Sequence, residues 1–230
     1  MAHLWRPLDS TLMRLTSFIA LVVLSLGVAG YAVVVYAFLP LGAALHPDMR
    51  ATFNAYRVGI YAHVFCSVVA LVLGPFQFRA RLRTTHLNLH RWLGRLYLGV
   101  GVLAGGSAGL FMALHAFGGV AARLGFASLA LAWLYTGLRA YLAIRSRDVV
   151  AHRRWMVRNF SLTFAAVTLR LWLPASFVSG IEFEVAYPVI AWLCWMPNLV
   201  VAELLFNRTH DPSVERTADV NAASAVQVER

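Results

Sequence analysis

Six apolar stretches, each about as long as a bilayer is thick, constrain this chain more than any other feature. They lie near residues 15–39, 58–78, 96–116, 121–143, 159–178 and 187–206. A helix needs about 20 apolar residues to cross the hydrocarbon core of a membrane, and a helix satisfies its own backbone hydrogen bonds there. We therefore predict an all-α integral membrane protein in which residues 1–206 form one bundle of six transmembrane helices.

The composition agrees with a lipid environment. Hydrophobic residues make up 60% of the chain, charged residues make up 13%, and the mean hydropathy is +0.67. The first stretch is longer than the core of a signal peptide, so we expect it to remain as an uncleaved anchor. Residues 207–230 are polar and lack apolar periodicity, which predicts a disordered cytoplasmic tail.

Arginine is distributed unevenly between the two sides of the predicted bundle. The formal net charge is +10, and every basic residue is arginine. The loops after the second and fourth stretches are the richest, with Arg79, Arg81, Arg83, Arg91 and Arg95 in one and Arg145, Arg147, Arg153, Arg154 and Arg158 in the other. Because arginine-rich loops stay in the cytoplasm, we predict that both termini are cytoplasmic. These charges fit anionic lipid headgroups better than nucleic acid.

Two related histidine motifs begin the third and fifth helices. His90-Arg-Trp-Leu-Gly-Arg95 resembles His152-Arg-Arg-Trp-Met-Val-Arg158, and the predicted topology puts both motifs on the same side of the membrane. Two facing imidazoles can hold one haem iron, with Arg95 and Arg158 binding its propionates. Alternatively, the histidines and arginines contact only lipid headgroups. No other metal site is predicted.

Two predicted helices carry a stripe of small residues at steps of three or four. The stripe of helix three is His90, Gly94, Tyr97, Gly101, Gly105, Ala108, Met112 and His115. The stripe of helix two is His63, Ser67, Ala70, Gly74 and Gln77. Such stripes allow either close helix packing or the approach of a flat ligand such as haem.

Three further residues, two near the outer ends of helices and one inside a span, are candidate site residues. His63 and His115 form a second, weaker histidine pair near the outer ends of helices two and three. Arg170 lies inside the fifth span, where a charge is expensive unless it faces a polar partner, so we expect it to point inward. Its partner is either a propionate, quinone oxygen or anionic solute, or Glu182 or Glu184 in a structural ion pair. The remaining alternative is that its side chain snorkels outward.

Motifs of soluble enzymes are missing from the sequence, which has no Gly-rich phosphate loop, no G-x-S-x-G and no H-E-x-x-H. No catalytic residue is therefore predicted, and any enzymatic activity would be that of a membrane oxidoreductase. The sequence also lacks C-x-x-C-H, so any haem would be non-covalent haem b. Cys66 and Cys194 lie in apolar segments, and we interpret them as reduced packing residues.

The motifs His63, Gly74-x-x-Gln77-x-Arg79, His90-Arg-x-x-Gly94-Arg95-x-Tyr97 and His152-Arg-x-Trp155-Met156-x-Arg158 resemble a family of bacterial membrane proteins, domain of unknown function 2306. The resemblance covers about residues 15–206. It implies a multi-pass protein of the bacterial inner membrane and brings no established activity. The chain is more distantly similar to six-helix cytochromes b, which implies histidine ligands on helices two, three and five; helix four has no histidine.

Two functional hypotheses follow from the sequence. The first is a haem b protein that uses His90 and His152 and takes part in transmembrane or quinone-linked electron transfer, with quinone or a redox protein as partner. The alternative is a non-enzymatic or transport-related protein that binds an anionic lipid or solute at its cytoplasmic Arg and His clusters. An assembly partner whose grooves receive another helix is a third possibility. The sequence leaves the oligomeric state open.

Overall fold

The computed structural model describes residues 7–43 and 46–207, with side chains for residues 15–43 and 46–204. Within these residues the chain is helical throughout. The elements are α1 (Pro7–Phe38), α2 (Pro47–Ala55), α3 (Arg57–Gln77), α4 (Ala80–Thr84), α5 (Leu87–Leu96), the π-helix η1 (Tyr97–Ala104), α6 (Gly105–Leu114), α7 (Gly119–Arg145), α8 (Val149–Thr163), α9 (Ala165–Val178), α10 (Phe183–Leu193), α11 (Met196–Val201) and the π-helix η2 (Ala202–Asn207). The predicted tail lies outside the described residues, apart from Asn207.

Six helical runs are long and apolar enough to cross a membrane, which confirms the predicted all-α fold. They are Leu15–Phe38, Arg57–Gln77, Leu87–Leu114, Gly119–Arg145, Val149–Val178 and Phe183–Leu204. The third and fifth runs begin at Leu87 and Val149, roughly two and a half to three turns earlier than hydropathy predicts. Their first turns carry the polar His90 and His152 motifs, so the helix continues beyond the apolar part of each span.

Large apolar side chains cover the outside of the bundle, as expected for a surface that faces lipid. Leu103, Leu131 and Val189 are more than half exposed, whereas Ala70, Ala122 and Ala140 are completely buried. Small side chains inside let the helix backbones approach one another, and this is how membrane helices associate without a hydrophobic driving force between them.

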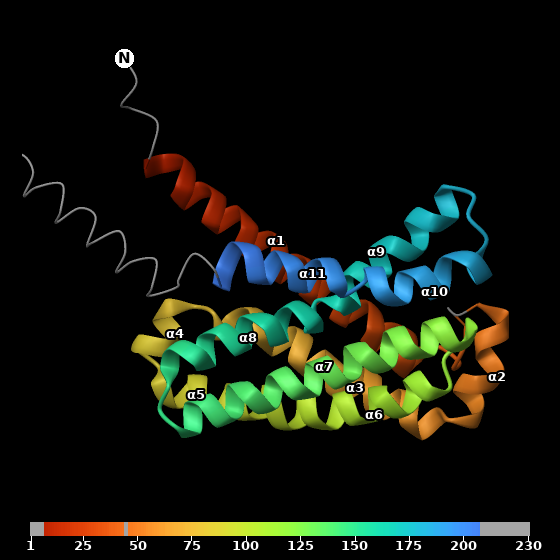
Figure 1. Ribbon diagram of the computed structural model, residues 1–230, viewed down its shortest axis with the longest axis horizontal. Helices are drawn as coiled ribbons and strands as arrows, with labels where there is room; N and C mark the ends of the chain where they lie inside the picture. The colour runs from red at the N-terminus through yellow and green to blue at the C-terminus, as the bar shows by residue number, and fades with distance from the viewer. Residues whose placement is uncertain (1–6, 44–45, 208–230) are drawn as a thin grey trace, which may run out of the picture.

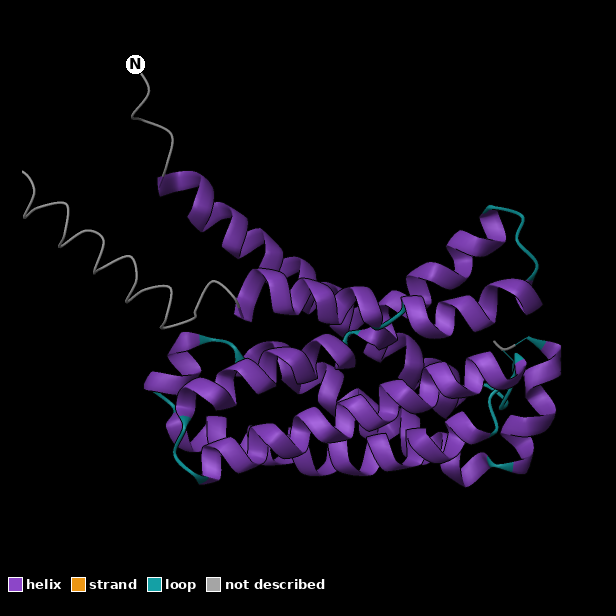
Figure 2. Cartoon of the chain, viewed as in Figure 1, coloured by secondary structure: helices purple, strands orange, loops and turns teal. Residues whose placement is uncertain are grey.

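Four spans form the centre of the bundle (Figure 1). Helix α3, the run α5–η1–α6, helix α7 and helix α8 lie side by side, and α7 contacts both α6 and α8. Helix α1 and the α9–α11 segment pack across one face of this group. The loops are short; most lie at the two ends, and others interrupt helices near the middle of the bundle (Figure 2). We call the end with α4 and the α7–α8 turn the arginine-rich end, and the opposite end the α2 end.

The fifth and sixth spans are interrupted beside each other. The fifth breaks at Phe164, and the sixth breaks at Cys194 and Trp195. Polar side chains satisfy the freed backbone: Thr168 Oγ1 donates to the Cys194 carbonyl, and Asn198 Nδ2 donates to the same carbonyl at 3.0 Å. Broken helices are tolerated within a membrane where they are buried in protein or line a cavity.

Candidate functional site

The two small-residue stripes predicted from the sequence face each other. A Cβ added at Gly101 would lie 2.7 Å from the Ala70 Cβ, and one at Gly105 would lie 3.0 Å from the Ser67 hydroxyl oxygen. One at Gly109 would lie 2.7 Å from the Nδ1 of His63. Helix α3 therefore fills this face of the third span, and the stripes serve close antiparallel packing.

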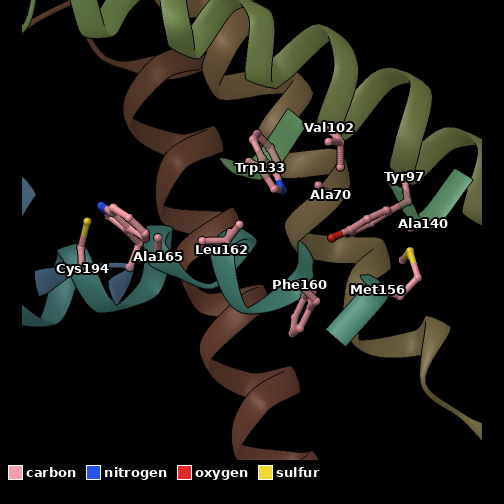
Figure 3. Packing of buried hydrophobic residues seen from close by; sticks show 11 residues of the cluster. Ala70, Tyr97, Val102, Trp133, Ala140, Met156, Phe160, Leu162, Ala165 and Cys194 are labelled. Atoms are coloured by element: carbon pink, nitrogen blue, oxygen red, sulfur yellow. The ribbon is translucent and has the colours of Figure 1, made fainter. Parts of the chain in front are cut away.

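A buried polar network lies at mid-bundle, next to these stripes. The Tyr97 hydroxyl donates to Asn159 Oδ1 at 2.7 Å and lies 2.8 Å from Thr163 Oγ1. The Trp133 indole donates to Thr163 Oγ1 at 2.9 Å, and Asn159 Nδ2 donates to Thr136 Oγ1 at 2.9 Å. Figure 3 shows the Tyr97 hydroxyl oxygen directed toward the helix that carries Phe160. The network joins the third, fourth and fifth spans.

A cavity of about 410 Å³ opens between this network and the α2 end. Thr163 and Trp133 of the network form part of its lining, together with Leu162 at the end of α8. The remaining wall comes from α1, α2, α3, α6, α7, α9 and α10 and is largely apolar and aromatic, with Phe126 and Tyr187 in contact at 5.5 Å between ring centroids. The cavity is therefore mostly apolar with a few polar groups in its lining, as is usual for a small-molecule binding site.

Arg170 places a positive charge on the wall of this cavity. Its Nη1 donates to the Ala166 carbonyl at 2.9 Å, and its guanidinium lies 5.6 Å from the centre of the Tyr31 ring. Among the side chains that the structure describes, neither Glu182 nor Glu184 forms an ion pair with it. Arg170 points inward as predicted, but the predicted ion-pair alternative is wrong.

His63 adds a hydrogen-bond acceptor to the same cavity. Its Nδ1 lies 2.9 Å from the Gly105 carbonyl oxygen, which can only accept, so Nδ1 carries the proton. In the neutral ring, Nε2 therefore holds the lone pair. Tyr36 also lines the cavity, and His63 and Tyr36 both lie within electrostatic reach of Arg170.

His115 belongs to the same cavity, so the structure brings together the two predicted outer histidines. Its ring packs 4.0 Å from that of Tyr56, and its Nδ1 lies 3.0 Å from the Phe111 carbonyl oxygen. His46, to which the sequence assigned no role, also lines the cavity and stacks on Phe183. Its position depends on the fold of the loop before α2, which no local pattern predicts.

The histidines predicted as haem ligands lie at the arginine-rich end. His152 Nδ1 lies 2.8 Å from the Ala140 carbonyl oxygen, which leaves Nε2 with the lone pair, as in many iron-ligating histidines. His90 is half-buried and lies within electrostatic reach of His152. The imidazole nitrogens of His90 and His152 are of the kind that can ligate haem iron.

The two arginines predicted as propionate ligands have other partners in the structure. Arg158 forms a bidentate pair with Glu203, with donor–acceptor distances of 2.8 and 2.6 Å. Arg95 is exposed and lies over the Trp92 ring. No pattern in the sequence predicts the Arg158–Glu203 pair, because the two residues come from different spans and share no spacing.

Six spans around an apolar cavity with one internal arginine define a polytopic helical membrane protein with a candidate small-molecule site. A family model described as predicted membrane protein (DUF2306) matches residues 60–206. The chain belongs to this family, as its motifs predicted. No curated protein and no solved structure matches the chain.

Proposed function

We propose that this membrane protein binds an amphipathic small molecule in the cavity, with an oxygen-bearing head group against Arg170. The observation that carries the proposal is the guanidinium of Arg170, which lines an apolar cavity and has no carboxylate partner among the described side chains. A charge inside a membrane protein is costly unless something compensates it, and a ligand oxygen can do so.

The polar groups of the cavity favour a quinone-type head group. Arg170 can donate to a carbonyl oxygen, and the His63 lone pair can accept from a hydroxyl of the reduced form. A carboxylate would be satisfied by Arg170 alone and would bring no donor for His63. The apolar and aromatic wall suits an alkyl or isoprenoid tail.

Fluorescence quenching by a short-tailed ubiquinone analogue tests this proposal, because Trp133 lines the cavity. We expect saturable quenching of the purified wild-type protein and a Kd about 10- to 100-fold higher for Arg170→Gln, since a hydrogen bond to a charged group contributes about 1.5–3 kcal/mol. A brominated fatty acid, measured in parallel, reports on carboxylate head groups.

Arg139→Gln is the matched control. Arg139 is also an arginine within a span, but it is exposed and stacks on Trp155 outside the cavity. Partition of the analogue into detergent affects both variants equally, so only site binding separates them. Equal quenching curves for the wild type and Arg170→Gln would contradict the proposal.

Haem binding by His90 and His152 stays a prediction, as does a role in electron transfer. The Nδ1–H of His152 is directed to a backbone carbonyl, which supports it. The predicted similarity to cytochromes b and the location in a bacterial inner membrane also stay predictions. An absorption spectrum in the Soret region of the purified protein tests the haem hypothesis.

A further inference from the structure

Three buried nitrogen atoms at the arginine-rich end have no hydrogen-bond partner among the described residues. They are Gln77 Nε2, Arg83 Nε and His90 Nδ1. Gln77, the last residue of α3, is only 5% exposed. Buried polar nitrogens are nearly always satisfied in proteins, so each such atom requires an explanation. The Gln77 and Arg83 nitrogens are always donors, and His90 Nδ1 is a donor in the tautomer that carries its proton there, so the three together indicate a missing acceptor.

These three side chains come from consecutive elements that meet at this end. Gln77 Oε1 lies 3.5 Å from the position of a Cβ at Gly94, and Gly94 lies one turn after His90 on the same helix face. His90 is within electrostatic reach of Arg83. The short helix α4 thus folds Arg83 back toward the ends of α3 and α5.

The region is strongly positive. Burial lowers the pKa of Arg83, and the charge of Arg153 on α8 lowers it further. The described carboxylates at this end are engaged elsewhere: Asp148 accepts from the Ala151 amide at the start of α8, and Glu203 pairs with Arg158. Within the part of the chain that the structure describes, no carboxylate therefore accepts a hydrogen bond from these nitrogens.

We infer that Gln77, Arg83 and His90 form a binding site for a phosphate group. A phosphate presents several oxygens in different directions, so one group can accept from all three side chains. The site lies where the apolar part of the spans ends, which is the depth of lipid phosphates. The phosphate comes either from a phospholipid headgroup or from a soluble anion. This inference does not depend on the cavity around Arg170.

Native mass spectrometry of the full-length protein tests the lipid source. Arg83→Gln and Gln77→Leu each remove one proposed donor. Arg81→Gln is the control, because Arg81 is an exposed arginine of the same short helix and loses the same charge. We expect wild type and Arg81→Gln to retain a bound phospholipid, and the occupancy to fall at least about tenfold in Arg83→Gln and Gln77→Leu.

Thermal unfolding of the delipidated protein in inorganic phosphate tests the soluble source. A rise in Tm for wild type and Arg81→Gln that is absent in Arg83→Gln and Gln77→Leu would support a soluble phosphate ligand. All variants are first compared by size-exclusion chromatography, and Gln77→Glu provides a second, nearly isosteric change at the buried position. The inference is overturned if neither assay separates Arg83 from Arg81, or if the wild type carries haem that is lost in His90→Ala.

Discussion

At the scale of single residues, the buried network around Asn159 is the most constrained part of this protein. Tyr97 and Asn159 are completely buried, and each makes more than one hydrogen bond to a neighbouring span. A polar group left without a partner in this environment is destabilising, so the network fixes how three spans fit together. Through Thr163, the network also contributes a polar group to the lining of the cavity.

Replacing Tyr97 by phenylalanine should destabilise the folded protein by about 1–2 kcal/mol. The change removes the hydroxyl that serves both Asn159 and Thr163 and leaves the ring in place. Reversible unfolding in mixed micelles measures the effect. Tyr61→Phe is the control, because the Tyr61 ring contacts Tyr36 and Phe65 away from the network. Equal stability of the two variants would contradict a structural role for the hydroxyl.

The sequence predicted the position of a single side chain only where the pattern that indicates it lies within one span. Arg170 lies well inside an apolar stretch and was therefore expected to face inward, and it does. The helical spacing of Asn159, Thr163 and Arg170 along the fifth span is also visible in the sequence. The hydrogen-bond partners of these residues could not be predicted. Tyr97 and Trp133 come from other spans, and their distances to Thr163 depend on how the bundle packs.

At the scale of elements, the antiparallel contact between α3 and the third span controls the shape of the bundle. The π-helix η1 lies in this contact, and its Gly101 allows the two backbones to approach closely. Both stripes were predicted from spacing alone. The sequence could not choose between a helix and a flat ligand as their partner, since small residues leave the same space for either.

Gly101→Ala should weaken this contact by about 1–3 kcal/mol, the usual effect of overpacking. The new Cβ would lie 2.7 Å from the Ala70 Cβ and 3.0 Å from its backbone, which cannot move aside as a side-chain end can. Gly99→Ala, two residues earlier in the same π-helix, would place its Cβ with nothing within 4 Å. We expect that variant to keep wild-type stability in the same unfolding assay, and a similar loss in both would contradict the packing model.

The breaks in the fifth and sixth spans were not predicted. Pro197 marks the start of α11, but the fifth span breaks at Phe164, ten residues before Pro174. The two breaks are stable because Thr168 Oγ1 donates to the Cys194 carbonyl of the sixth span and Asn198 Nδ2 donates to the Ser161 carbonyl of the fifth span at 3.3 Å. Hydropathy reports only that a segment is apolar, so it cannot reveal a turn that side chains from another span support.

At the scale of the whole molecule, the two ends differ in charge and in the binding site proposed for each. The proposed phosphate site lies at the arginine-rich end, whereas the cavity lies toward the α2 end, with the buried network between them. The orientation of these ends in a membrane stays a prediction from the arginine distribution. This orientation decides from which side of the membrane a soluble ligand would reach each proposed site, and from which leaflet a lipid would reach it.

Cysteine labelling in intact cells tests the orientation. Ser146 and Ser179 are both exposed and lie in turns at opposite ends, Ser146 between α7 and α8 and Ser179 after α9. If the arginine-rich end is cytoplasmic, a membrane-impermeant maleimide should label Ser179→Cys in intact cells and Ser146→Cys only after lysis. The parent chain, with Cys66 partly and Cys194 fully buried, gives the background. The reverse pattern would place the proposed phosphate site on the outer surface, where a cytoplasmic anion could not reach it.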